Sequence, residues 1–176
     1  CRIVSSFSRI IQKEAEYYNA DYCLVDVCPN LGGLNRAVLV SADFVVVPMA
    51  ADLFSLQGLR NLGDRLAVWR KEWAERLSRA KFQDLELPYK SITPLGYIVM
   101  QHGSNKGRHE KSYITSMKRI TGVYSTSVLH RDAGNEFTIE NDPNCLALLK
   151  HYHSLVPMAM EARKPIFLLK PADGAI

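Results

Sequence analysis

The chain has 176 residues, 47% of them hydrophobic and 23% charged, which is ordinary for a soluble globular protein and enough for one domain with a sizeable core. No apolar run reaches the length of a membrane span, and the net charge of +4 does not by itself indicate nucleic-acid binding. The four cysteines form no C-x-x-C pair, so we expect small buried side chains in a reducing compartment, not a metal site or disulfides.

The N-terminal third predicts a helix followed by a βαβ unit. Apolar side chains recur at helical spacing from Phe7 to Tyr18 and predict an amphipathic helix over about residues 5–19. Residues 22–27 and 44–47 are short, near-continuous apolar runs, joined by a turn and an apolar helical segment at 34–42. Two such runs with a helix-length crossover predict parallel strands of a sheet buried on both faces.

The first predicted strand carries a carboxylate, Asp26, near its end. Ligands of parallel sheets lie beyond the carboxyl ends of the strands, and a carboxylate there can hold Mg²⁺ or its water shell. The turn that follows contains Pro29 and the pair Gly32-Gly33, so its backbone can come close to a bound phosphate. The alternative is that Asp26 only initiates this turn, as aspartates after strands often do.

The middle of the chain predicts a long helix, a strand and a second helix. Leu59, Leu66 and Trp73 belong to an apolar stripe on a helix over about residues 55–79, with Ser55 as its N-cap and its tryptophans in the core. The further predicted elements are a buried strand at 95–100, a helix at 108–124, a short strand at 123–129, a loop at 130–144, a helix at 146–160 broken near Pro157, and an extended run at 165–169.

The spacing of several residues around this unit resembles the ParA/MinD family of P-loop ATPases. The residues that carry the resemblance are Asp26-Val27-Cys28-Pro29-Asn30-Leu31-Gly32, Ala42-Asp43, Val47-Pro48, Asp52, Leu56 and Gly58-Leu59. That family has an aspartate at the end of its Walker B strand, a D-x-x-P switch turn, an Ala-Asp before the next strand, and a Pro–acidic–Leu-x-Gly-Leu pattern after it. Residues 161–166 and 173–175 extend the likeness, more weakly, across nearly the whole chain.

The resemblance implies an α/β fold with a mostly parallel, doubly wound sheet and helices on both faces. Residues 1–176 would be a single partial nucleotide-binding domain, truncated at the N-terminus and at the C-terminus. The phosphate-binding Walker A loop of the family lies upstream of Walker B, and this sequence contains no G-x-x-x-x-G-K-[ST] string. We therefore expect that these residues alone neither bind ATP tightly nor hydrolyse it.

By the same resemblance, the parent protein would use ATP and Mg²⁺. Asp26 would organise Mg²⁺ through water, and Pro29 and Gly32 would belong to the turn that senses the γ-phosphate. Gln101 and His130 would contact adenine by position, since in the family these contacts follow the two late strands. The sequence departs from the family pattern at Cys28, at Ala37 and at residues 128–130.

ParA-type dimers bind DNA non-specifically through basic residues of their C-terminal half. The residues that would do so here are Lys106, Arg108, Lys111, Lys118 and Arg119. Scattered lysines and arginines suffice for such binding, because phosphate neutralisation needs no sequence readout. The alternative is that they form a solvated helix face.

Two function classes follow. The first is an ATP-dependent dimerisation switch in the cytoplasm, with a ParB-like stimulating adaptor, acting in plasmid or chromosome partitioning or in intracellular positioning. The second is a non-hydrolysing binding or scaffold module of the same ancestry. A doubly wound enzyme of flavodoxin-like type fits the strands, but not the Asp-x-x-Pro spacing.

Overall fold

The computed structural model describes residues 5–28, 30, 32–79, 87–88, 92–102, 108–132, 137–150, 152 and 154–174. Its elements along the chain are α1 (Ser6–Tyr18), α2 (Gly33–Ser41), β1 (Phe44–Ala50), α3 (Leu53–Ser78), β2 (Thr93–His102), α4 (Arg108–Val123), the π-helical turn η1 (Tyr124–Val128), β3 (Cys145–Lys150), α5 (Leu155–Ala162) and the 3-10 turns η2 (Ile166–Leu168) and η3 (Pro171–Gly174). The helices predicted at 5–19, 55–79 and 108–124 and the strands predicted at 44–47 and 95–100 are confirmed.

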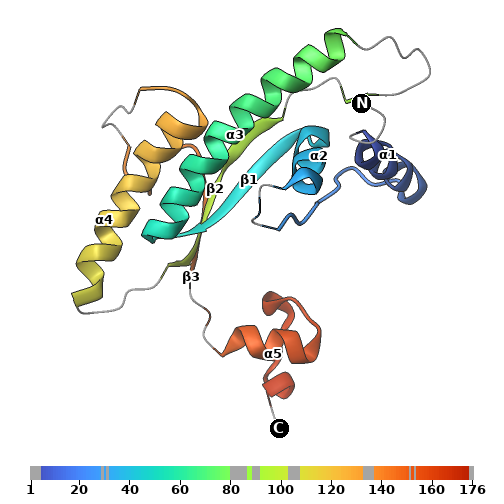
Figure 1. Cartoon of the computed structure of the whole chain (residues 1–176). Helices are drawn as coiled ribbons and strands as arrows, with labels where there is room; N and C mark the ends of the chain where they lie inside the picture. The colour runs from blue at the N-terminus through green and yellow to red at the C-terminus, as the bar shows by residue number, and fades with distance from the viewer. Residues whose placement is uncertain are drawn as a thin grey trace.

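The sheet has three parallel strands in the order β1-β2-β3, which confirms the α/β class. β1 pairs with β2 from Phe44–Thr93 to Ala50–Met100, and β2 pairs with β3 from Tyr97–Cys145 onward. α3 and α4 are the crossovers, and both contribute to the core cluster on one face of the sheet (Figure 1). Apolar side chains of β1 on the other face, Phe44 and Val46, are 59% and 37% exposed.

The core consists of two clusters that both include α3. Leu56 and Leu59, in the first half of α3, pack with strand residues such as Tyr97 and Val99 and with α4. The second half of α3 packs against α2, through a cluster of Leu39, Val40, Leu66, Trp69, Trp73 and Ile92. Both tryptophans are 5% exposed, so the prediction that they belong to the core is confirmed.

A buried tyrosine fixes the segment before β3 to β2. The Tyr97 hydroxyl donates to Asp142 Oδ2 at 2.7 Å, and Asp142 Oδ1 accepts from the backbone and side-chain nitrogens of Asn144, both at 2.8 Å. The Tyr97 ring lies 5.0 Å from that of Tyr124. Burial raises the pKa of Tyr97, and it raises the pKa of Tyr124 to about 12, so both hydroxyls stay protonated at physiological pH.

The strand predicted at residues 22–27 is wrong. The segment is extended but belongs to no sheet, and Tyr22 and Leu24 are 89% and 97% exposed. Apolar composition makes a strand only where a neighbouring strand pairs with the backbone and covers the side chains. Among the described residues, β1 pairs with β2 alone, so this run has no neighbour.

Three predictions for the C-terminal half are also wrong. Residues 124–128 form the π-helical turn η1, in which Tyr124 and Val128 are buried, instead of a strand. The first part of the predicted helix 146–160 is the strand β3, whose backbone pairs with β2. Pro157 is the third residue of α5, a position whose N–H has no partner within the helix, so it does not break the helix. The run at 165–169 contains a 3-10 turn.

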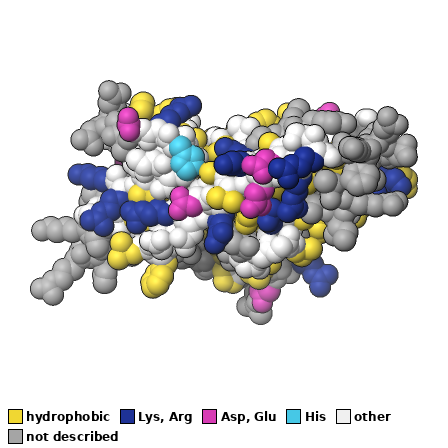
Figure 2. Space-filling model, turned by 45° about the horizontal axis from the view of Figure 1, so that its top comes forward, with side chains coloured by type: hydrophobic (Ala, Val, Ile, Leu, Met, Phe, Trp, Pro, Cys, Tyr) yellow, Lys and Arg dark blue, Asp and Glu magenta, His cyan; other side chains and the backbone are white. Residues whose placement is uncertain are grey.

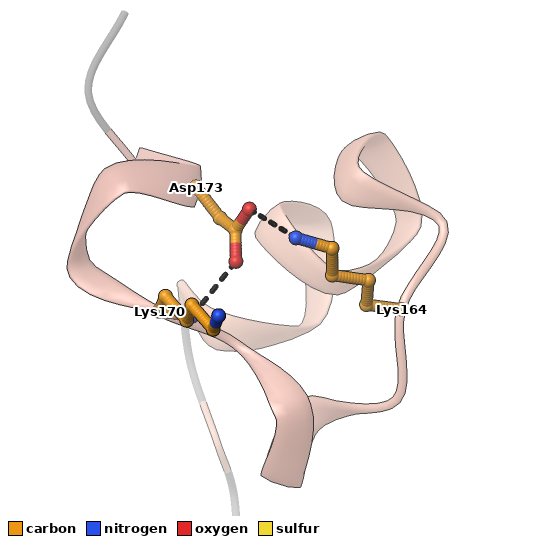
Figure 3. A network of polar contacts seen from close by, with 3 residues as sticks. All are labelled: Lys164, Lys170 and Asp173. Carbon is orange, nitrogen blue, oxygen red and sulfur yellow. Dashed lines mark hydrogen bonds and ion pairs between the residues drawn. The ribbon is translucent and has the colours of Figure 1, made fainter.

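The residues after β3 form a small unit of α5, η2 and η3, which lies beyond the end of the sheet (Figure 1). Lys164 Nζ contacts Asp173 Oδ1 at 2.6 Å, and the Lys170 backbone nitrogen donates to Asp173 Oδ2 at 2.7 Å (Figure 3). These two bonds lower the pKa of Asp173 and close the loop between α5 and η3.

Gly63 permits a close contact between α3 and η1. A Cβ at this position would lie 2.1 Å from the backbone oxygen of Ser127 in η1. We predict that Gly63→Ala destabilises the protein by about 2 kcal/mol, because backbone cannot move aside as a side chain can. Gly58 of the same helix has nothing within 4 Å of its Cβ position, so Gly58→Ala should stabilise by about 0.5–1 kcal/mol. Urea unfolding of both variants measures the difference, and equal effects would contradict this account.

Candidate functional site

The candidate site is the turn between residues 26 and 33, which leads into α2. Asp26 lies in the exposed extended segment and is itself exposed. Pro29 lies outside the described residues, whereas Gly32 is the N-cap of α2 and Gly33 is its first residue. Both glycines are exposed, and a Cβ at Gly33 would meet nothing within 4 Å. The first amides of α2 are thus open at a helix end whose dipole favours negative charge.

Asn35 holds this turn in place. Its Nδ2 lies 2.7 Å from the backbone oxygens of Cys28 and Asn30 and 2.9 Å from Asn30 Oδ1. Asn30 Oδ1 also accepts from the Gly32 nitrogen at 3.1 Å. Asn35 is 7% exposed, so its amide is a buried polar group satisfied almost entirely by the turn.

Asn35 is a residue that the sequence interpretation missed. It lies three positions after the N-cap, where a short polar side chain can reach back to the preceding backbone. The comparison with the family pattern considered only position 37, which is the buried core residue Ala37. The signal that could have found Asn35 is a lone amide in the first turn of an otherwise apolar helix.

α2 is in turn fastened to α3. Arg36 forms an ion pair with Glu72, and its guanidinium carbon lies 6.0 Å from the Trp69 ring centroid. On the buried side of α2, Leu39 and Val40 pack into the cluster of Trp69 and Trp73. A continuous set of contacts therefore connects the turn through Asn35 to α2 and α2 to α3, which lie side by side in Figure 1.

Asp52, part of the family-like pattern after β1, has a structural role. It is the N-cap of α3, and its Oδ1 accepts from the Ser55 backbone nitrogen at 2.7 Å. Ser55, predicted as the N-cap, instead lies inside the helix, where its hydroxyl accepts from the Ala50 nitrogen at 3.3 Å. The prediction of the N-cap was wrong by three residues, because both residue types cap helices and only the backbone decides between them.

The structure does not bring Gln101 and His130 together. Gln101 is the second-last residue of β2, at the carboxyl end of the strand, and its side chain is not among those that the structure describes. His130 is exposed and follows η1, beside Leu129, which lines a cavity at the amino end of β2. The residue that ends β3 is Lys150, followed by the partly exposed Tyr152. The interpretation of residues 123–129 as the last strand placed the adenine contact that follows this strand at His130. The last strand is β3, which ends about twenty residues later.

Of the basic residues proposed for DNA, Lys118 and Arg119 are exposed on α4. Arg108 and Lys111 belong to α4, but their side chains lie outside the description, and Lys106 lies outside the described residues. Figure 2 shows lysine and arginine side chains gathered in groups, with aspartate and glutamate side chains between them. Both signs of charge therefore share this face.

A metal ion has one candidate ligand at the turn. Among the described residues, no group of three or more His, Cys, Asp or Glu side chains could hold a metal ion. Mg²⁺, however, keeps several waters and is bound by one or two carboxylates plus phosphate oxygens, so an exposed lone Asp26 fits a water-mediated role. In the part of the chain that the structure describes, no helix is both long and apolar enough to cross a membrane.

Residues 4–79 match the model of a protein family described as an AAA domain. Two curated Pseudomonas putida proteins, one described as an uncharacterised protein of strain KT2440 and the other as an uncharacterised protein in the gidB 3′ region, are each 40% identical over 48 residues. These matches cover 27% of this chain and 18% of each relative, so the chain spans less than a fifth of their length.

A solved structure of protein DIP2308 from Corynebacterium diphtheriae is similar with a TM-score of 0.44 and 22% identity, over 83% of this chain and 50% of that one.

Asn35→Ala should loosen the turn, because the carbonyl groups of Cys28 and Asn30 would lose their donor. We predict a loss of about 1–3 kcal/mol in the free energy of unfolding and faster amide exchange at Gly32. Asn61→Ala is the matched control, since Asn61 is exposed on α3 and only accepts from Gln57 at 3.0 Å. Unchanged exchange at Gly32 in the Asn35 variant would contradict the role of this side chain.

The family match contains Asp26, the turn, α2 and all of α3, and it confirms the resemblance of this chain to the ParA/MinD-like P-loop ATPases.

Proposed function

We propose that this chain is part of a ParA-like ATPase that works as an ATP-dependent dimerisation switch. The observation that carries the proposal is the attachment of the turn 28–32 to α2 by Asn35, within a segment that matches the ATPase family. A turn held by one buried amide has a defined resting position and can be displaced as a unit. That is the property a switch segment needs.

Each residue of the turn has a role in this proposal. ATP with Mg²⁺ supplies a γ-phosphoryl group whose negative charge the metal helps to neutralise. The Asp26 carboxylate would hold the water shell of the metal ion. By the resemblance, Pro29 and Gly32 would belong to the turn that senses the γ-phosphate, and the helix dipole at the start of α2 favours a nearby anion.

The switch would have its effect on a second copy of the chain. Movement of the turn would pass through Arg36 and Trp69 to α3, whose far side is exposed. We propose a cytoplasmic homodimer, stimulated by a ParB-like adaptor, in partitioning or positioning of a cargo. A non-hydrolysing scaffold of the same ancestry is the second candidate. The lone exposed carboxylate favours it, because nothing else described at the turn commits the site to hydrolysis.

Asp26→Asn in the full-length protein tests the hydrolytic proposal. We expect Mg-dependent ATP hydrolysis to fall by about 10- to 100-fold, as for loss of a residue that orients metal-bound water. Asp21→Asn, an exposed aspartate of the same extended segment, should leave the rate within about twofold. Hydrolysis that resists the Asp26 change would contradict the assigned role, and absence of hydrolysis in the unmodified protein would favour the scaffold.

The salt dependence of DNA affinity tests whether α4 binds DNA. Replacing Lys118 and Arg119 by glutamine should reduce the slope of log affinity against log salt by about 2, since each phosphate contact contributes about 0.9. Lys13→Gln with Lys170→Gln removes the same charge from exposed positions on α1 and near the C-terminus, and should leave the slope unchanged. A slope near zero for the unmodified protein would refute DNA binding.

A further inference from the structure

A cavity of about 470 Å³ lies between α3, η1 and the beginning of β2. Its polar lining residues are Arg70, Thr93, Arg131 and Asn144. Because Thr93 begins β2 and His102 ends it, the cavity and the carboxyl end of the sheet are separated by about 30 Å at about 3.3 Å per residue. No described residue of the turn 26–33 or of α2 lines the cavity, so it is a separate site from the proposed switch.

Arg70 brings an uncompensated charge to this cavity. It lies on α3 next to Trp69, its Nε is buried, and that nitrogen has no hydrogen-bond partner among the described residues. Burial lowers the pKa of Arg70, because the charged guanidinium is partly removed from water. Among the described residues no carboxylate forms an ion pair with it. Arginine buried in this way is ordinarily paired.

Arg131 adds a second guanidinium to the lining of the cavity. Its backbone nitrogen donates to the Ser125 oxygen at 3.0 Å, which fixes the chain as it leaves η1. The side chain of Arg131 likewise has no ion pair with a described carboxylate. Two like charges that line one cavity repel each other, and an anion bound between them would relieve this repulsion.

The remaining walls define the shape of what can bind. The side-chain amide of Asn144 is oriented by its 2.8 Å bond to Asp142, so one N–H hydrogen stays available toward the cavity. Ile92, Pro94, Val128 and Leu129 supply apolar surface. A volume of about 470 Å³ is within the range of small-molecule sites, which are mostly apolar with a few fixed polar groups.

We propose that this cavity binds a small molecule that has an oxyanion group and an apolar body. The oxyanion, a carboxylate or a phosphate ester, would accept from Arg70 and Arg131, whose forked donors suit either group. The apolar body would lie against Ile92 and Val128. The four apolar residues of the lining favour a ligand with an apolar part over a DNA backbone, which is uniformly polar and would leave them without a partner.

Calorimetric titration of the 176-residue chain at constant ionic strength tests this site. Phenyl phosphate and benzoate are the probes; inorganic phosphate and acetate stand for their oxyanion halves, and phenol stands for the apolar half. We expect one of the two probes to bind at a single site, at least about tenfold tighter than either half. Which probe binds tighter distinguishes a phosphate-ester ligand from a carboxylate ligand.

Three variants decide whether the binding is at this cavity. Arg70→Gln and Arg131→Gln should each weaken the probe by about tenfold or more, the loss expected for a charge-assisted hydrogen bond. Arg131 is exposed, so its variant should fold even if the Arg70 variant does not. Arg65→Gln is the control, because Arg65 is exposed on α3 and does not line the cavity.

Failure of both probes to bind would overturn the proposal, and so would equal weakening by the Arg65 variant. Binding of a short DNA duplex that Arg131→Gln weakens, without binding of either probe, would also overturn it and assign the two arginines to a nucleic-acid surface.

Discussion

Burial of the apolar stripe of α3 is the interaction on which the rest of the structure depends. One half of the stripe, with Leu56 and Leu59, closes the core over β2, and the other half, with Leu66, Trp69 and Trp73, closes it over α2. A fully buried side chain of this size contributes about 1.5–3 kcal/mol, so the stripe outweighs any single polar contact described here. Without α3, α2 would lose the tryptophan cluster that covers its apolar face, and the sheet would keep only α4 and η1, of the helices described, on the face that α3 shares with them.

The polar contacts of α2 orient the turn relative to this buried stripe. Asn35 and Arg36 are adjacent on α2, and they face different partners: Asn35 binds the turn 28–32, whereas Arg36 binds Glu72 and lies over Trp69. The Arg36–Glu72 pair is partly exposed, so its contribution to stability is small. Its effect is to set the orientation of α2, and thereby of the turn, relative to the buried stripe.

The sequence predicts what depends on local pattern and misses what depends on neighbours. The spacing of Leu59, Leu66 and Trp73 predicts α3, and the β-branched runs predict β1 and β2. Periodicity and side-chain type are sufficient to predict these three elements. Residues 22–27 have the same composition as β1, yet their place is decided by pairing, which no local pattern contains. Residues 145–150 are leucine-rich and fit either helix or strand, and only the pairing with β2 decides.

In the candidate site, too, local spacing predicts some residues and contacts with neighbouring segments decide others. Its turn and Asp26 could be proposed from spacing, whereas the Asn35 contacts depend on how α2 begins. The position of His130 was missed because α4 returns the chain to the amino end of the sheet and η1 prolongs it there.

The close contact at Gly63 also explains why a cavity exists at the amino end of the sheet. Gly63 lets η1 approach the backbone of α3, and the residues that follow in η1 and beyond it, Val128 and Leu129, then form one wall. Arg70 lies seven residues after Gly63, two helical turns along α3, so both project from the same face of the helix toward η1. Crossovers usually pack closed at this end of a parallel sheet, and ligands bind at the other. Here η1, which prolongs α4, contacts α3, and the space beside the strand ends is lined by Arg70 and Arg131. The amino end of the sheet can thus carry chemistry of its own, on residues that belong neither to the turn nor to α2.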